Sequence, residues 1–472
     1  NTNLGYNGLQ YATTQKTTTG ITRRRNAGYF ARASYSFDDA YYLTASYRRD
    51  GASVFGADNK WGNFYAFGGA WRVTHEKFME KVRFLNDLKL KLSWGRNGNQ
   101  GIDPYGTLSE AVIGPGGGIA YPFGNSTVPS FGIKQNSLGN SGLGWETTNS
   151  WNFGFESAWL NNRLFVNMDV YLSRTTDQIF NRTIPSMTGF DSMKSTMGEV
   201  ANRGVEFSIH SVNIENKDWR WDTNLTFWLN RNELVHLYGE DLDGDGREDD
   251  DLGNNLFIGH SIHSIYGYKV AGIVQKDDTE YIQANGATPG NPKYVDVDGN
   301  GTIGVEDRTI LGTSDPRFKM SLSNTLSWKN FELYFMLTGT FGGNGYYVSE
   351  NAPAFLAGGG GGGAYSNNMY IPYWTEERPS NKYPAANFSG DGRFKGLQSR
   401  AFLRLQDITL SYTFNSAKIK NFGINNLRVF FTGKNLFTIT GWENGDPELG
   451  NTILSSTYPI STNLSLGANI SF

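Results

Sequence analysis

GYFARASYSFDDAYYLTASYRRD, at residues 28–50, alternates bulky or small apolar residues with mostly polar ones on both sides of Asp38 and Asp39. A period of two is that of a β-strand, because successive side chains point to opposite faces of a sheet. A short acidic turn between two such runs predicts a β-hairpin. The hairpin would have one apolar and one polar face.

The same period of two returns along most of the chain. It is clearest at residues 88–94, 151–172, 219–229, 319–341 and 464–472. Short turns and long loops alternate between these runs, and the longest loops are expected at 97–146 and 342–400. We expect about fifteen or sixteen strands in an all-β chain. Residues 75–87 predict the one convincing short helix.

The amino-acid composition is typical of a protein built from strands and turns. The 472 residues include 58 glycines, and aromatic residues make up 14% of the chain. The formal net charge of -3 means that the chain has no excess of positive charge that would attract nucleic acid. The absence of cysteine excludes disulfides, thiolate metal sites and cysteine nucleophiles. No apolar run reaches the about 18 residues that a membrane helix needs, but alternating strands can cross a membrane without one.

The asymmetry between short turns and long loops distinguishes two architectures. A soluble sandwich buries its apolar face in a core, whereas a transmembrane antiparallel β-barrel turns that face to lipid and its polar face to water. Outer-membrane barrels also have short turns at one rim and long extracellular loops at the other. The polar second face of nearly every predicted strand favours the barrel.

One loop has the spacing of a calcium site. In YVDVDGNGTIGVEDRTIL, residues 294–311, the oxygen-bearing residues of a calcium loop fall at positions 1, 3, 5, 7 and 12. These residues are Asp296, Asp298, Asn300, Thr302 (through its backbone carbonyl) and Asp307, with Gly301 at the turn. We expect a structural calcium ion here without two flanking helices. The alternative is an Asp/Asn/Gly-rich turn that needs no metal.

A second acidic stretch, DLDGDGREDDD at residues 241–251, echoes this motif. Asp241, Asp243, Asp245 and Asp249 could hold another ion. Leu252, however, stands where the closing acid should be. A solvated acidic loop is the alternative.

No group of residues predicts catalysis. There are five histidines, and His260 and His263 have a spacing that a metal pair could use, but the residues around them indicate loop and strand. An enzyme would need an acid and a base in one cleft. We expect the chain not to be an enzyme.

Several segments resemble the SusC/RagA family of TonB-dependent outer-membrane transporters of Bacteroidetes. They include residues 28–79, LNDLKLKLSWGRNGNQGI, LGWETTNSWNFGFESAWLNNRLFVNMDVYLSRTTDQIF, MGEVANRGVEF, FLRLQDITLSYTF, VFFTGKNLFTITGW and the terminal LSLGANISF, in the family's order. The resemblance implies an outer-membrane barrel of about 22 strands. It also implies an N-terminal plug domain, energy coupling through TonB, a SusD-like lipoprotein lid and a dimer of such heterodimers.

The resemblance also implies a role. We expect residues 1–472 to be the C-terminal part of a receptor barrel, because no plug or TonB box is found. The function would be import of oligosaccharides or peptides. Candidate substrate contacts are the loop aromatics Tyr370, Tyr373, Trp374 and Trp442, although aromatic girdles and loop packing also explain such residues. Two alternatives stay open: a surface binding or adhesion protein without transport, and a soluble carbohydrate-binding β-protein.

Overall fold

A long antiparallel sheet forms most of the molecule in the computed structural model. The structure describes residues 21–113, 120–121, 130–196, 198–346, 372–388, 396–414, 423–443, 446–449 and 460–472. Thirteen strands form the sheet, and each pairs with the next along the order β1-β2-β3-β4-β9-β10-β13-β14-β19-β20-β23-β24-β25. The strands are β1 (Asn26–Phe37), β2 (Tyr41–Ala52), β3 (Trp61–Arg72), β4 (Leu85–Asn99), β9 (Glu146–Trp159), β10 (Leu164–Thr176), β13 (Glu199–Glu215), β14 (Trp219–His236), β19 (Phe318–Trp328), β20 (Phe331–Phe341), β23 (Phe402–Thr413), β24 (Asn426–Thr440) and β25 (Asn463–Ser471).

The predicted hairpin at residues 28–50 is confirmed. Strands β1 and β2 pair from Asn26↔Ala52 to Phe37↔Tyr41. At the turn, Asp38 and Asp39 have φ values of 50° and 47°. Asp tolerates this left-handed conformation better than most residues, which is the physical reason for the acidic turn.

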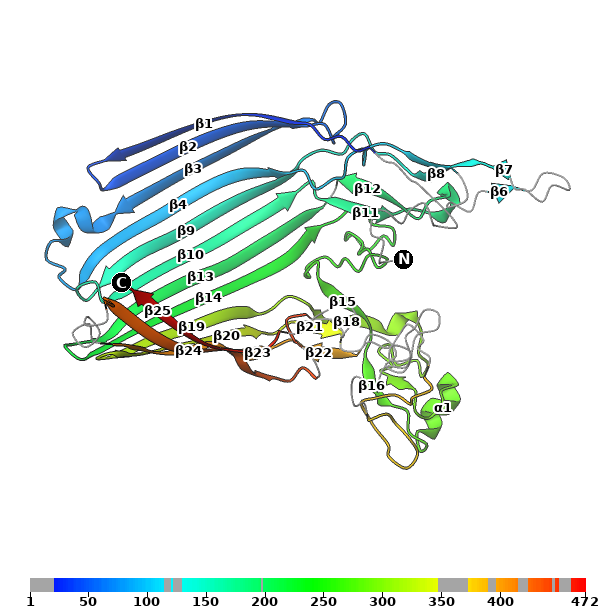
Figure 1. The fold of residues 1–472 in the computed structure, drawn as a ribbon. Helices are drawn as coiled ribbons and strands as arrows, with labels where there is room; N and C mark the ends of the chain where they lie inside the picture. The colour runs from blue at the N-terminus through cyan, green and yellow to red at the C-terminus, as the bar shows by residue number, and fades with distance from the viewer. Residues whose placement is uncertain are drawn as a thin grey trace, which may run out of the picture.

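The sheet is curved and open in the described part of the chain. Strand β1 forms one edge and β25 the other (Figure 1). Thirteen wall strands are fewer than the fifteen or sixteen expected. Other short strands pair with each other in separate hairpins outside the wall, and most of these hairpins lie in the ranges 97–146 and 342–400 that were expected to be loops. These hairpins are β5 (Glu110–Ile113) with β8 (Ile133–Ser137), β6 (Ala120–Tyr121) with β7 (Ser130–Phe131), β11 (Ile179–Thr183) with β12 (Ser192–Thr196), and β21 (Asn344–Tyr346) with β22 (Leu397–Ser399).

One face of the sheet is apolar and exposed. Strand register places Trp94, Trp151 and Leu172 in one row on this face, and Leu172 is 57% exposed. On β3, Trp61 and Trp71 lie on the same face near opposite ends of the strand. Ten residues of strand tilted by about 40° cover about 25 Å along the membrane normal, the height of a lipid-facing band. The apolar face therefore has the dimensions of a membrane-embedded surface.

The helix predicted at residues 75–87 is wrong. The segment contains only two 3₁₀ turns, Val73–His75 and Lys77–Met79. Glu76 accepts hydrogen bonds from Tyr41 Oη (2.5 Å) and Trp71 Nε1 (3.1 Å), and these contacts hold the segment against the end of the sheet. No helix within the described ranges is long and apolar enough to cross a membrane.

The excursion between β14 and β19 forms a small folded unit at one end of the sheet (Figure 1). It contains β15 (Ser264–Tyr268), β16 (Val270–Ile273), α1 (Thr279–Asn285), β17 (Pro292–Tyr294) and β18 (Arg308–Thr313). Strand β15 pairs with β18, and β16 pairs with β17. The loop expected to bind calcium connects β17 to β18.

Candidate cation loop and the loops around it

The carboxylate of Asp296 organises the first half of the candidate calcium loop. It accepts hydrogen bonds from the backbone N–H groups of Gly299 and Gly301, both at 2.7 Å. Gly301 has a φ of 87°, a conformation that side chains other than glycine rarely adopt. The predicted need for glycine at the turn is therefore confirmed.

The carboxylate of Asp307 closes the loop from the inside. Its side chain is completely buried. It accepts backbone hydrogen bonds from Val297 N at 2.6 Å and from Gly304 N at 2.7 Å, with a longer one of 3.4 Å from Asp298 N. The N–H of Gly304, and next that of Val297, hold the pKa of Asp307 below its usual range. Asp307 is thus kept as an anion facing the loop interior.

Three carboxylates converge in this loop. Oxygen atoms of Asp296, Asp298 and Asp307 lie within 4.8 Å of one another. Asn300 is drawn into the same turn, because its Oδ1 accepts the N–H of Thr302 at 2.8 Å. Oxygen ligands in a flexible loop suit a hard cation such as Ca²⁺. The cluster could bind a metal ion.

Helix α1 braces the loop from one side. Asn285 Oδ1 accepts the N–H of Ile303 at 2.7 Å. Tyr281 Oη accepts the N–H of Tyr294 at 2.9 Å, just before the loop begins. A strand, β17, enters the loop, and a single 3₁₀ turn at Val305–Asp307 leaves it. The arrangement agrees with the expectation of a calcium-type loop without two flanking helices.

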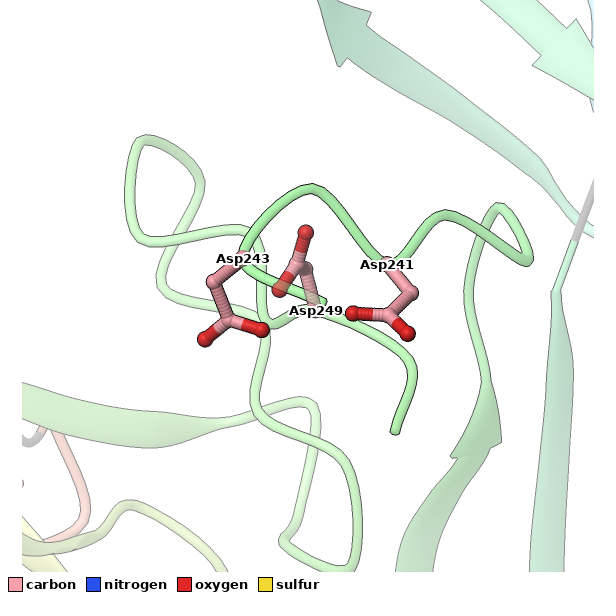
Figure 2. Close-up of side chains that lie close together, drawn as sticks. All are labelled: Asp241, Asp243 and Asp249. Atoms are coloured by element: carbon pink, nitrogen blue, oxygen red, sulfur yellow. The ribbon is translucent and has the colours of Figure 1, made fainter. Parts of the chain in front are cut away.

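In the second acidic loop, Asp241, Asp243 and Asp249 lie close together (Figure 2). Asp241 accepts the N–H groups of Gly244 (2.8 Å) and Gly246 (3.0 Å). Asp249 accepts the N–H of Leu242 at 2.6 Å. Oxygen atoms of Asp241, Asp243 and Asp249 also lie within 4.8 Å of one another. The calcium-loop spacing placed Leu252, and no acid, at the closing position. In the structure, the carboxylate of Asp249 closes the cluster instead. This cluster too could bind a metal ion.

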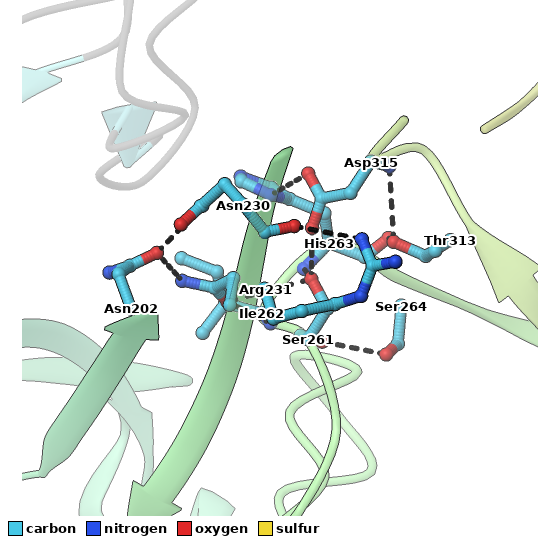
Figure 3. Close-up of polar contacts among 10 residues, drawn as sticks. Asn202, Asn230, Arg231, Ser261, Ile262, His263, Ser264, Thr313 and Asp315 are labelled. Atoms are coloured by element: carbon cyan, nitrogen blue, oxygen red, sulfur yellow. Dashed lines mark hydrogen bonds and ion pairs between the residues drawn. The ribbon is translucent and has the colours of Figure 1, made fainter. Parts of the chain in front are cut away.

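A polar network fastens the excursion to the wall (Figure 3). His263 Nδ1 contacts Asp315 Oδ1 at 2.8 Å, and Ser261 Oγ donates to the other oxygen of Asp315 at 2.5 Å. Ile262 N donates to Asn232 Oδ1 at 3.0 Å, which joins the network to β14. The hydrogen bond to Asp315 raises the pKa of His263. His263 therefore serves as an anchor and is not paired with His260 as a metal ligand among the described contacts.

The candidate substrate residues are placed as follows. Trp374 is buried against Ile273 and Ala385, and its Nε1 donates to Gln275 Oε1 at 2.9 Å. Trp442 is also buried, and Tyr373 is half-buried. Tyr370 lies outside the described residues. For the two tryptophans, this burial matches the loop-packing alternative.

Glu443 joins two further loops, a role that sequence reasoning missed. Its carboxylate accepts hydrogen bonds from Lys382 Nζ and Tyr383 Oη. The segment that carries these two donors also contacts the excursion, since Asn381 Oδ1 accepts the N–H of Ile273 at 3.0 Å. Three loops that are far apart in sequence thus form one assembly. A single glutamate in a loop has no spacing signal by which it could have been found.

The comparisons with known proteins agree with this architecture. A family model described as "TonB dependent receptor-like, beta-barrel" matches residues 1–436. The chain belongs to the TonB-dependent receptor β-barrel family. This family consists of outer-membrane receptors and transporters and not of enzymes, as expected from the sequence. The protein is accordingly located in the outer membrane of a Gram-negative bacterium.

Two curated relatives are similar over nearly the whole of this receptor chain. TonB-dependent receptor P26 of Formosa agariphila is 31% identical over 94% of this chain and 46% of the relative. TonB-dependent receptor SusC of Bacteroides thetaiotaomicron is 31% identical over 96% of this chain and 44% of the relative. The chain thus spans less than half the length of these relatives.

Two solved structures are also similar to nearly the whole of this chain. The RagAB peptide transporter matches 95% of this chain and 47% of its own with a TM-score of 0.73 at 26% identity. The RagAB peptide importer in its "open-open" state gives a TM-score of 0.74 over 97% of this chain. The likeness to the SusC/RagA family and the all-β barrel architecture are therefore confirmed.

Proposed function

We propose that this chain is the C-terminal part of the barrel of a TonB-dependent importer that takes up peptides or oligosaccharides. In this proposal a plug domain and the remaining wall strands belong to the same longer polypeptide. The open sheet supports this assignment. Edge strands β1 and β25 carry backbone groups without a neighbouring strand in the described part of the chain. Each such group costs several kcal/mol in lipid, so further strands must cover these edges.

The two-faced wall is the observation that carries the function. Its apolar face has the height of a lipid band, and its other face presents polar groups such as Asn167, Ser208 and Thr226 to a lumen. These three line a hollow of about 560 Å³ on the lumenal side. A wall that is apolar on its outer face and polar on its inner face can enclose a polar passage. Transport needs such a passage, and adhesion alone does not.

A peptide is the first cargo to test. RagAB, a structural neighbour, is a peptide transporter, and oligosaccharides are the alternative cargo. Tyr373, at the edge of the loop assembly, and Tyr370 are the aromatic candidates for cargo contact. Trp374 and Trp442, also candidates, would act mainly by holding the loops in place. A SusD-like lipoprotein would cover the mouth, TonB would act through the plug, and two such heterodimers would associate.

The candidate calcium loop would have a structural role. Asp296, Asp298, Asn300, Asp307 and the carbonyl of Thr302 would hold a calcium ion, which supplies positive charge that neutralises the clustered carboxylates. Through α1 and β18 the ion would stiffen the excursion beside the mouth. Extracellular calcium sites work at about 10⁻⁴–10⁻³ M, so a weak site suffices.

Native mass spectrometry and uptake test the proposal together. The complex would be extracted from outer membranes in mild detergent and then dissociated to weigh each chain. We expect a chain well above 52.5 kDa together with a lipidated partner. Cells lacking the gene should lose uptake of labelled peptides or labelled oligosaccharides, and collapse of the proton motive force should have the same effect. A lone chain near 52.5 kDa with unchanged uptake would instead favour the surface-binding function.

A further inference from the structure

Outward-facing arginines gather at one end of the apolar face. The arginine row consists of Arg96 on β4, Arg174 on β10, Arg203 on β13 and Arg231 on β14. Register aligns them, since Arg96 and Arg174 both pair with Asn149, and Arg203 pairs directly with Arg231. All four are exposed. Each borders the apolar residues of its own strand on the same face: Arg96, Arg174 and Arg231 follow them in the chain, and Arg203 precedes them because β13 runs the opposite way.

The position of the row relative to lipid follows from β14. Its outward residues from Trp219 to Leu229 form the lipid-facing stretch, which includes Leu225 and Phe227. Ten residues of tilted strand cover about 25 Å, the full height of the lipid band. Arg231 is the next outward residue. Its guanidinium therefore lies at the level of the lipid headgroups, at the end of the wall where the long loops emerge.

The centre of the row places two like charges opposite each other. Directly paired residues have Cβ atoms about 5 Å apart, and like charges in such a pair repel. Arg231 donates to the backbone carbonyls of Asn230 (3.0 Å) and Arg317 (2.8 Å), and within the described residues no carboxylate pairs with it. A wall that keeps two arginines side by side in this way is suited to an anion held between them.

Carboxylates neutralise the row only in part. Glu199 contacts Arg174 at 2.8 Å, and Glu233 contacts Arg203 at 3.4 Å. Asp58 and Asp177 line the same hollow as Arg96, which puts negative charge near the β4 end of the row. Within the described residues, Arg231 has no carboxylate contact, and the Arg203–Glu233 contact at 3.4 Å leaves the Arg203 side chain 66% exposed.

We propose that Arg203 and Arg231, flanked by Arg174, bind the phosphate group of a phosphate-bearing lipid in the outer leaflet. Guanidinium groups match phosphate oxygens in a bidentate geometry. The acyl chains of the same lipid would lie along Leu229, Phe227 and Leu225 below. Phosphate and chains would thus be held by neighbouring parts of one strand face.

Native mass spectrometry of the full-length protein in mild detergent tests this site. The probe is diphosphorylated lipid A, and the comparison lipid is the same glycolipid after removal of its phosphates. We expect preferential retention of the phosphorylated form. The Arg203→Gln/Arg231→Gln variant should bind it about tenfold more weakly, because two charge-assisted contacts are lost.

Matched controls keep the test decisive. Arg32→Gln/Arg220→Gln removes the same charge from the lumenal face of β1 and β14 and should bind like the wild type. Arg203→Lys/Arg231→Lys keeps the charge and should bind between the wild type and the Gln variant, and heat-modifiable gel migration checks folding of each variant. Equal retention of both lipids, or wild-type binding by the Gln variant, would overturn the proposal. Full displacement by excess inorganic phosphate would assign a free-phosphate site instead.

Discussion

The two acidic loops of the β14–β19 excursion share a motif and differ in how they close. Both begin with Asp-x-Asp, and each has a glycine at its sixth position, Gly246 with a φ of 83° and Gly301 with a φ of 87°. In each loop the first aspartate accepts the N–H of that glycine. The turn chemistry of the two loops is therefore the same.

The closing residues make the difference. Asp307 is completely buried and accepts three backbone N–H groups. Asp249 is only partly buried, and its described hydrogen bond is with Leu242 N. A buried acceptor that satisfies several N–H groups costs more to remove than an exposed one that satisfies a single group. Two loops with the same motif can therefore differ in how firmly they are held closed.

Removal of the Asp307 side chain should have the largest effect. In Asp307→Ala, Val297 N and Gly304 N lose their acceptor inside the protein, so the 296–307 loop should open at least about tenfold more often. Amide hydrogen exchange of Val297 and Gly304 in the full-length protein measures this opening. Unchanged exchange at both amides would show that Asp307 does not close the loop.

Calcium removal should have the next largest effect. Millimolar calcium should slow exchange in residues 296–307 by about tenfold relative to chelator, by mass action on the closed loop. The 241–249 loop should respond less, because its closing carboxylate is more exposed. Magnesium at the same concentration is the control, since it fits flexible loops poorly. A loop 296–307 that is indifferent to calcium would leave it as a metal-free turn.

Truncation of Asp249 should have a smaller effect than truncation of Asp307. Asp249→Ala removes the acceptor of Leu242 N, which lies near solvent and can bond to water. We expect about threefold faster exchange at Leu242 and no change in the 296–307 loop. An effect as large as that of Asp307→Ala would mean that the two closures are equivalent.

The turn glycines should behave alike. A Cβ on Gly246 or Gly301 would meet no atom within 4 Å, so alanine there adds only backbone strain. Each substitution should destabilise its loop by about 1 kcal/mol. Local exchange in Gly246→Ala and Gly301→Ala measures both on one scale. A large difference between them would locate the asymmetry in the turns and not in the closing acids.

A change of pH should have the smallest effect and should leave both loops alone. The pKa of His263 is raised by Asp315. Its contribution to stability is therefore present below the unfolded pKa of about 6.5 and is lost as pH rises through the raised value. Since the pair is half exposed, the protection of the Ser264 N–H, after correction for the intrinsic pH dependence of exchange, should fall only about twofold at alkaline pH. His263→Gln should abolish this dependence.

Strand periodicity anticipated the wall because a barrel strand meets lipid on one side and water on the other. The hairpin at residues 28–50 and the terminal strand Asn463–Ser471 occur where alternation predicted them. The helix expected at 75–87 does not form, since Glu76 is held by Tyr41 and Trp71 from the sheet. A tertiary contact there outweighed the local pattern.

The sequence by itself determined the two-faced strands, their turns and the spacing of the oxygen ligands in the 296–307 loop, because these depend on neighbours a few residues apart. Only the tertiary structure decided that Asp249 closes the second loop, that Glu443 joins distant loops, and that Arg203 and Arg231 lie side by side. These relations depend on strand register and loop packing. Contacts between residues far apart in the chain leave no local period by which they could be recognised.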